Sequence, residues 1–321
     1  MDAQITGLLF EDARRNFAEI GKEVGISKNA AWSRYLKMNR EGVITGATVQ
    51  INYRKLGYDA VGTLMLDIEP SQLEELSRYI ATRVPEAFGP FFSASKFNAG
   101  AVVPLRNVSE LGKIKEELSR KLIVTEISSS LWTDVWFVPE NLSLIPVRSA
   151  NITNLKTEDN SVFHADKIDL HLIEALAKDS RTSFRALAIQ LGVSIDTVAR
   201  RYRRLKEEKV IVPRIQIDPR KIGYNALVNF YLKIMPQFDV DVILNELLQF
   251  SDAFYVMKFR GDFSVGMMLM VKSIQDMLET GDHIARITGV KRTETVVSSV
   301  TDKWPLPRTY TSTLGRNTTA T

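Results

Sequence analysis

The sequence predicts an α+β protein in which two winged helix-turn-helix domains and two ferredoxin-like βαββαβ domains alternate in tandem. Three observations lead to this prediction. A chain of 321 residues is long for a single core. Two long stretches of the chain align with each other, which indicates an internal duplication. Each copy contains a helix, a glycine turn and a second helix, followed by strand and helix patterns in the order βαββαβ.

The duplication is clearest between the stretch that begins at Phe10 and the stretch that begins at Ala177. They align without gaps, with Ser27 against Ser194. The residues of copy one that have an identical partner in copy two are Asp12, Arg14, Phe17, Gly25, Ser27, Arg34, Tyr35, Glu41, Val43 and Ile44. After the loss of one residue, NYRKLGYDA from Asn52 matches DPRKIGYNA from Asp218.

Domain boundaries follow from this alignment and from shifts in composition. Asn, Ser and Thr rise between the copies, and the end of the chain is polar with several Pro, Thr and Ser. The predicted segments are a helix-turn-helix domain at 1–50, a ferredoxin-like domain at 57–138, a linker at 139–163, a second helix-turn-helix domain at 164–217, a second ferredoxin-like domain at 223–301 and a disordered tail at 302–321.

Composition excludes several classes of protein. The chain has no cysteine, which excludes disulfides and thiolate metal sites. Its three histidines, His164, His171 and His283, are too scattered for a metal site, so we expect no metal and no cofactor. The first residues are not typical of a signal peptide, and the longest apolar runs, such as 265–271, are too short to span a membrane. We therefore expect a cytoplasmic protein with no membrane partner.

The helix-turn-helix prediction rests on apolar spacing and capping residues. In copy two the first helix has an apolar stripe, Gly192 suits a left-handed C-cap, and Ser194 is a good N-cap for the second helix. The apolar residues of the two helices are Phe184, Leu187, Ala188, Leu191, Val198, Tyr202 and Leu205. Copy one repeats the pattern with Phe17, Ile20, Val24, Gly25, Ile26, Ser27, Ala31, Tyr35 and Met38.

The second helix of copy two, TVARRYRRLK, concentrates positive charge beside its apolar stripe. Such a helix fits the DNA major groove, where its first turn reaches base edges and later arginines reach phosphates. The candidate DNA-binding residues are Ser194, Asp196, Thr197, Arg200, Arg201, Arg203 and Arg204 in copy two, and Ser27, Lys28, Arg34 and Lys37 in copy one. The alternative is that these are solvated charges on an exposed helix.

Copy one is the weaker candidate for DNA binding. Ser33 and Leu36 replace Arg200 and Arg203, and Trp32 replaces Ala199. We therefore predict an asymmetric pair in which copy two contributes more of the attraction to phosphates. On this prediction, replacing Arg201 and Arg204 by alanine weakens duplex binding more than replacing Arg34 and Lys37.

The second part of each copy has the strand and helix order of a ferredoxin-like domain. The predicted elements in copy one are strand 61–68, helix 71–82, strands 87–95 and 99–103, helix 108–121 and strand 124–131. Those in copy two are strand 226–234, a helix over 240–248, strand 254–259, a turn at 261–264, strand 265–271, a helix from 273 and strand 291–299.

Together these motifs resemble the Lrp/AsnC family of transcriptional regulators. The stretch from Asp179 to Ile211 resembles the family's helix-turn-helix, DPRKIGY its hinge, and GDF and GVKRTET its sensor domain. The resemblance implies a sequence-specific transcriptional regulator that binds double-stranded DNA, responds to an amino acid or similar molecule, and forms homo-oligomers through its sensor domains. Such proteins usually carry one copy, so this chain would resemble a covalent pseudo-dimer.

The resemblance also implies an effector site at the turn between the second and third strands of the sensor domain. In copy two this turn is Gly261, Asp262, Phe263 and Ser264. Asp262 would bind an ammonium group and the turn amides a carboxylate. The alternative is a simple tight hairpin turn. Copy one has SKFNAGAV there, without Gly-Asp.

Two other functions remain as alternatives. Some haem-pathway decarboxylases resemble the same two-domain fold, so a siroheme-decarboxylase-like enzyme is one of them. We expect no enzyme, and name no catalytic residue, because none of the three histidines falls in a predicted sensor pocket. The other alternative is a sensor or assembly protein that has lost DNA binding.

Overall fold

The computed structural model describes residues 1–84, 87–93, 95–137, 153–154, 161–250 and 253–306. They divide into two compact units, each of which contains parts of both copies. Unit one draws on Met1–Gly57, Asn160–Lys221 and Thr301–Thr321, and unit two draws on Tyr58–Asp159 and Ile222–Val300. No helix in the described part of the chain is long and apolar enough to cross a membrane.

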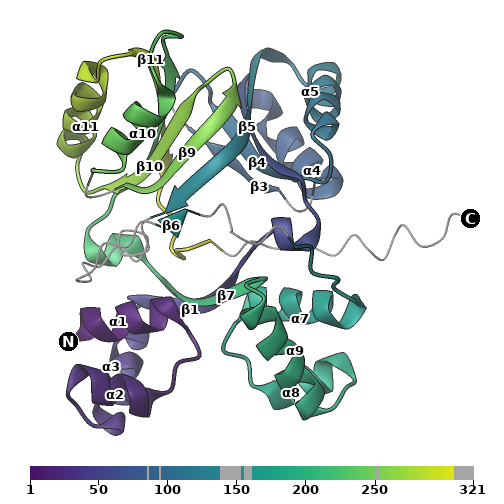
Figure 1. Cartoon of the computed structure of the whole chain (residues 1–321), viewed down its shortest axis with the longest axis vertical. Coiled ribbons are helices and arrows are strands. Elements are labelled where there is room, and N and C mark those ends of the chain that lie inside the picture. Colours follow the sequence, from purple (N-terminus) through teal and green to yellow (C-terminus); the bar gives the residue numbers. More distant parts are fainter. Residues whose placement is uncertain (85–86, 94, 138–152, 155–160, 251–252, 307–321) are drawn as a thin grey trace, which may run out of the picture. The chain divides into compact units, whose positions relative to one another are not determined.

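Unit one contains the two helix-turn-helix motifs (Figure 1). We call α1–α3 head one and α7–α9 head two. The elements of unit one are α1 (Asp2–Glu11), α2 (Phe17–Val24), α3 (Lys28–Arg40), β1 (Ile44–Ile51) and η1 (Arg54–Leu56) from copy one, and α7 (Lys167–Lys178), α8 (Phe184–Leu191), α9 (Ile195–Glu207), β7 (Ile211–Ile217) and most of η3 (Pro219–Ile222) from copy two.

The predicted caps set the ends of these helices. Ser27 and Ser194 each accept a hydrogen bond from a backbone N–H in the first turn of α3 and α9. Gly25 and Gly192 end α2 and α8 with φ of 79° and 66°, which is the left-handed region where a residue without Cβ is favoured.

The strand that follows each head pairs with its counterpart in the other copy. β1 and β7 form an antiparallel ribbon in which Ile51 lies opposite Ile211 and Ala47 lies opposite Ile215. A winged helix-turn-helix domain has its wing after the second helix, which in copy two is the stretch 210–218. This stretch forms β7, and its partner is β1.

Parts of the predicted linker and tail have defined structure. Trp304 is buried and makes an antiparallel bridge with Ile217, and Gln216 donates a hydrogen bond to the carbonyl of Pro305. Phe163 is also buried, and its N–H donates to the carbonyl of Lys55. The prediction of disorder is wrong for 302–306, because the indole of Trp304 is buried and its backbone pairs with β7. The rest of the tail, 307–321, and most of the linker lie outside the described residues.

Unit two is built from both ferredoxin-like repeats. Copy one contributes β2 (Ala60–Ile68), η2 (Pro70–Gln72), α4 (Leu73–Arg83), β3 (Phe88–Phe92), β4 (Ala99–Leu105), α5 (Ser109–Lys121) and β5 (Val124–Phe137). Copy two contributes β8 (Ala226–Ile234), α10 (Val240–Leu247), β9 (Ala253–Gly261), β10 (Val265–Val271), α11 (Ile274–Arg286) and β11 (Val290–Ser299). A short strand, β6 (Thr153–Asn154), pairs with β5.

The strands of unit two join into one sheet with the order β11-β8-β10-β9-β5-β2-β4-β3. Each half has the same internal order, and β5 joins β9 antiparallel, with Leu131 opposite Arg260. Helices α4 and α5 cover one half, and α10 and α11 cover the other (Figure 1). The two repeats therefore pair within one chain, which is the arrangement expected of a covalent pseudo-dimer.

Each half of unit two has its own apolar core, and a third apolar cluster contains residues from both halves. It brings Met65 and Phe97 of copy one together with Tyr231, Phe259 and Phe263 of copy two. Burial of Tyr231 in this cluster raises the pKa of its phenol far above the usual range, because the charged form would lose its hydration. The cluster ties the halves together by apolar burial as well as by strand pairing.

Candidate nucleic-acid interface

Helix α9 turns its apolar residues inward and its charged residues outward. Val198, Tyr202 and Leu205 are buried in head two. Arg200 and Arg203 are exposed, and among the described residues neither has an ion-pair or hydrogen-bond partner. These two guanidinium groups are therefore available to a polyanion without the loss of an internal contact.

The other cations of α9 make contacts within unit one. The guanidinium of Arg204 lies 4.3 Å from the ring centroid of Phe163. The ammonium of Lys206 lies 2.5 Å from a carboxylate oxygen of Asp12 in head one. Both side chains are on the surface, where such contacts are weak. A phosphate that binds Arg204 or Lys206 would have to compete with these contacts.

Arg201 is placed differently from the expectation that it contacts DNA. Its Nη1 lies 2.7 Å from Oδ1 of Asp169 and 2.8 Å from Oδ2 of Asp166, at the start of α7. Only 18% of the Arg201 side chain is exposed, and 1% of that of Asp169. The hydrogen bond to Asp169, opposed by burial, raises the pKa of Arg201. We interpret Arg201 as a residue that positions α9 against α7.

Head one repeats this ion pair at the equivalent positions. Nη1 of Arg34 on α3 lies 2.8 Å from Oδ1 of Asp2 on α1, with both side chains close to half exposed. Lys28 and Lys37 are exposed, and Lys37 lies 3.8 Å from Glu41. Of the cations predicted on α3, Arg34 thus has a structural partner, while Lys28 points to solvent.

Each head contributes an arginine that contacts the other head. Nη1 of Arg14 in head one donates to the carbonyls of Ser180 and Thr182 at 2.6 and 2.9 Å. Its guanidinium lies over the rings of Phe184 and Tyr202, 4.4 and 5.1 Å from the centroids. Burial lowers the pKa of Arg14 and, together with Asp12, raises the pKa of Tyr202 to about 12.

Arg181 of head two makes the reciprocal contact. It donates to the carbonyl of Ala13 and lies over the rings of Phe17 and Tyr35, 5.3 and 5.0 Å from the centroids. Arg14 and Arg181 occupy the same position in the two copies. We call this pair of contacts the arginine exchange. Sequence comparison already marks Arg14 as identical to its partner, but nothing in the sequence shows that each crosses to the other copy.

Backbone contacts reinforce the arginine exchange with the same symmetry. The N–H of Ala13 donates to the carbonyl of Pro213 at 3.1 Å, and the N–H of Ser180 donates to that of Ala47 at 3.2 Å. Each bond runs from the end of a head's first helix to the strand of the other copy. The spacing between α3 and α9 is therefore fixed by polar contacts on both sides of the ribbon.

Known proteins share the helix-turn-helix of each head. The model of the AsnC-type helix-turn-helix domain matches residues 1–39 and 166–206, which contain the helices of both heads except the last residue of α3 and of α9. The HTH-type transcriptional regulator Ptr1 of Methanocaldococcus jannaschii is 32% identical over 117 residues, which cover 36% of this chain and 78% of Ptr1. The chain belongs to the Lrp/AsnC family. The LrpA regulator of Pyrococcus horikoshii is 40% identical over 76 residues, 24% of this chain and 54% of LrpA.

A solved structure has a similar fold over nearly the whole length of this chain. The crystal structure of the siroheme decarboxylase NirDL matches with a TM-score of 0.61 and 14% identity, over 93% of this chain and 91% of that chain. At this level of identity the match concerns the fold alone. It supports the fold of two repeats in one chain.

The turn 261–264, which the resemblance to the Lrp/AsnC family suggests for effector binding, makes hydrogen bonds within unit two. Oδ2 of Asp262 accepts hydrogen bonds from Oγ of Ser128 and from the N–H of Ser129, both at 3.0 Å. Phe263 is buried, and its N–H donates to Oγ of Ser130 at 3.4 Å. Gly261 has φ 142° and approaches Ser129 so closely that a Cβ would lie 2.5 Å from its carbonyl oxygen.

These contacts join the turn to β5 of the other copy. The last residue of the turn, Ser264, contacts β8 of its own copy: its N–H donates to the carbonyl of Leu232, and its Oγ accepts from the N–H of Ile234. Of the two interpretations left open by the sequence, the geometry favours a structural turn. An ammonium group at Asp262 would have to displace or share the hydrogen bonds from β5.

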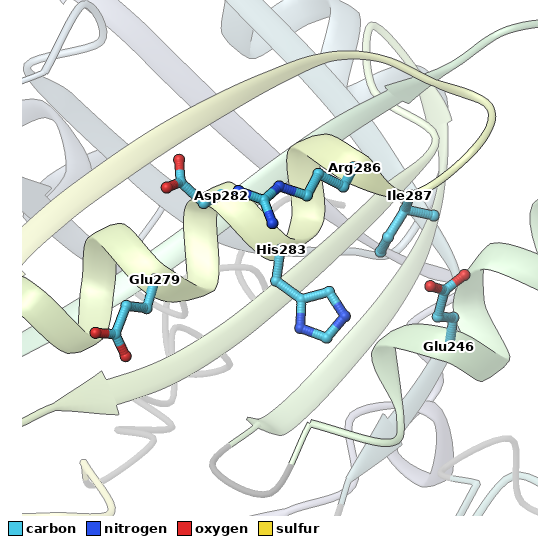
Figure 2. Close-up of a pocket in the computed structure, with 6 residues that line it drawn as sticks. All are labelled: Glu246, Glu279, Asp282, His283, Arg286 and Ile287. Carbon is cyan, nitrogen blue, oxygen red and sulfur yellow. The ribbon is translucent and has the colours of Figure 1, made fainter.

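Unit two also has an open groove between α10 and α11. Figure 2 shows its lining, which consists of Glu246, Glu279, Asp282, His283, Arg286 and Ile287. The imidazole of His283 lies against Phe250, with 4.7 Å between ring centroids. The described part of the chain contains no group of three or more histidine and carboxylate side chains placed to hold a metal ion. The groove does not contain the residues of the expected effector turn.

Proposed function

We propose that this member of the Lrp/AsnC family regulates transcription by binding one DNA duplex with α3 and α9 at the same time. The observation that supports this best is the arginine exchange, because it fixes two capped, outward-facing helices on one scaffold. Two such helices at a fixed spacing suit two neighbouring half-sites on a duplex.

The charge distribution supports a polyanionic partner for head two. Arg200 and Arg203 have no internal partner in the described structure. Asp196 and Thr197 precede them in the first turn of α9. In this position Arg200 reaches base edges, and Arg203 and Arg204 reach phosphates. Ser194, by contrast, caps the helix, which leaves its hydroxyl bonded to the backbone of Thr197.

Salt dependence of duplex binding tests the proposal. For a DNA binder the logarithm of the association constant falls linearly with the logarithm of salt concentration, with a slope of about −0.9 for each phosphate neutralised. We expect the variant in which Arg200 and Arg203 are both alanine to bind more weakly and to have a shallower slope. Duplex binding that is absent, or unaffected by salt and by this variant, would contradict the proposal.

We further propose that unit two binds a small-molecule effector such as an amino acid. The family resemblance supports this, whereas the contacts of Asp262 indicate that the ligand does not use that carboxylate alone. A thermal-shift screen of the free amino acids tests it, with raised unfolding temperature as the expected result. If no amino acid raises it, the effector proposal fails and DNA binding is unaffected.

Association between chains is a separate proposal. The paired repeats within one chain already form the sheet junction at β5 and β9, so homo-oligomers would use another surface. A solution mass above one chain is the expected result, and a mass of one chain would contradict it.

The competing function is that of a decarboxylase, favoured by the fold of NirDL. We propose that the chain is not an enzyme. His171 is exposed on α7, His164 is exposed before α7, and His283 lies in the groove of unit two, so the three imidazoles are on separate elements. Titration with siroheme distinguishes the two functions. An unchanged absorbance spectrum agrees with the regulator, and a shifted one with conversion of the tetrapyrrole would overturn this assignment.

A further inference from the structure

Four outward positions differ between α3 and α9. Residues spaced by four, three and four along a helix share one face. On α9 the exposed residues at this spacing are Asp196, Arg200, Arg203 and Glu207. The equivalent exposed residues on α3 are Asn29, Ser33, Leu36 and Arg40. No pair is identical.

The inward faces of the same two helices are alike. Tyr35 and Tyr202 are identical and both buried, and Met38 is matched by Leu205, which is also buried. Packing therefore keeps the same kinds of side chain in both copies. The changes of charge between the two helices therefore lie among their exposed residues.

Exposed apolar side chains stand at different positions on the two helices. Trp32 and Leu36 are 42% and 41% exposed on α3, where α9 has Ala199 and Arg203. Near the start of α9 the situation is reversed, since Ile195 is 49% exposed where α3 has Lys28. Exposed apolar side chains of this size on a helix surface require an apolar partner to leave water.

The major groove offers a partner for both kinds of side chain. Thymine presents a methyl group to apolar side chains, and guanine presents two acceptors to arginine. The first turn of a recognition helix lies nearest the base edges. Ile195 and Arg200 are within the first two turns of α9, and Trp32 and Ser33 are at the equivalent depth on α3.

We infer that the two heads read different base sequences, so that the operator consists of two unlike half-sites. This inference rests on the proposed function. Head two selects guanine through Arg200 and a thymine methyl through Ile195. Head one selects a thymine methyl group through the exposed part of Trp32, whose ring also packs against Phe17 and Tyr35 of the same head. Two identical heads related by a two-fold axis would instead require a palindrome.

Selection from a library of random duplexes with the full chain tests this inference. The expected product has two different half-sites at one constant spacing. A palindromic product would overturn the inference and leave the proposed function intact. If no sequence is enriched over the starting library, the proposed function fails, and the inference fails with it.

A variant with matched heads makes the test sharper. Replacing Lys28→Ile, Asn29→Asp, Trp32→Ala, Ser33→Arg, Leu36→Arg and Arg40→Glu gives α3 the outward residues of α9 that the inference uses. All six positions are exposed, so the buried residues of head one are unchanged. The variant is expected to select an inverted repeat of the head-two half-site, with the original spacing. Selection of the wild-type sequence would overturn the inference.

The reverse substitutions protect the test against a variant that does not fold. Replacing Arg200→Ser and Arg203→Leu removes the two arginines of α9 that have no partner among the described residues, and it leaves head one unchanged. The expected result is a loss of base preference, about tenfold or more, in one half-site, with the other half-site unchanged. An equal loss in both half-sites would contradict separate reading by the two heads.

Discussion

The guanidinium of Arg201 on α9 holds the buried carboxylate of Asp169 on α7, with 2.7 Å between Nη1 and Oδ1. Arg200, the preceding residue, points to solvent without a partner among the described residues. Neighbouring arginines on one helix thus have different roles. One positions the helix, and the other is available for DNA.

Replacing Arg201 by alanine is expected to destabilise the protein without a specific effect on DNA contacts. The substitution leaves the carboxylate of Asp169 buried without its cation, which costs about 3 kcal/mol of unfolding free energy. Urea denaturation measures this loss. Arg200→Ala is the matched control and should change stability by less than about 0.5 kcal/mol while weakening duplex binding. A stable Arg201→Ala variant with greatly weakened DNA binding would show that Arg201 contacts DNA directly.

The same cluster predicts a dependence of stability on pH. Although burial opposes it, hydrogen bonds from the backbone of Asp169 and from Arg201 lower the pKa of Asp166. A carboxylate whose pKa is lower in the folded state stabilises the fold above its unfolded pKa of about 3.9, and this contribution disappears as pH falls through the folded value. The stability difference between wild type and Asp166→Asn should therefore be constant near neutral pH and shrink below about pH 4. A difference that grows on acidification would contradict this assignment.

The arginine exchange should control the binding of two half-sites rather than one. Arg14→Ala with Arg181→Ala removes hydrogen bonds to main-chain carbonyls and the contacts with four aromatic rings. Without these contacts the spacing between the heads is no longer fixed, so binding of one head no longer favours binding of the other. Affinity for the full operator should therefore fall about tenfold or more. Affinity for a single half-site should stay the same, as measured by fluorescence anisotropy.

Arg15→Ala is the control for the arginine exchange. Arg15 is adjacent to Arg14, but its ion pairs are with Glu11 and Glu23 of the same head. It should leave both affinities unchanged apart from a small effect of net charge. Equal losses for the full operator and the half-site in the double variant would mean that the exchange does not set the spacing.

Gly261→Ala should destabilise unit two. The residue has φ 142°, and an added Cβ would lie 2.5 Å from the carbonyl oxygen of Ser129, so the turn cannot keep its contacts with β5. We expect a loss of about 2 kcal/mol, measured by thermal or urea denaturation. Gly112→Ala on α5 is the contrasting change, because no heavy atom lies within 4 Å of its Cβ position, and it should stabilise by about 0.5–1 kcal/mol. An unaffected Gly261→Ala variant would show that the turn is not held by β5.

Local features of the fold were predictable from the sequence because they depend on residues close together in the chain. Ser194 and Gly192 determine the ends of α8 and α9 through capping and a left-handed turn, and the structure confirms both. The order βαββαβ follows in the same way from apolar spacing, and it is also confirmed in both halves of unit two. Trp304 escaped prediction, because a single tryptophan in a polar segment has no period to reveal its burial.

Contacts between the copies were not predictable. The pairing of β5 with β9 and the crossing of Arg14 to Phe184 join residues far apart in the chain, and no local pattern specifies such partners. The positioning role of Arg201 was missed because charge alone does not distinguish it from Arg200. Only the position of Asp169 on α7 separates them.

Hydroxyl-radical footprinting of the full chain on its selected duplex tests the central claim most directly. If α3 and α9 enter one duplex together, the protein should protect two patches whose centres are about one helical turn, or a whole number of turns, apart. The patch under head two should fade when Arg200 and Arg203 are replaced by alanine, and the other should remain. A single protected patch, or two that fade equally, would contradict the account of two helices held outward on one scaffold.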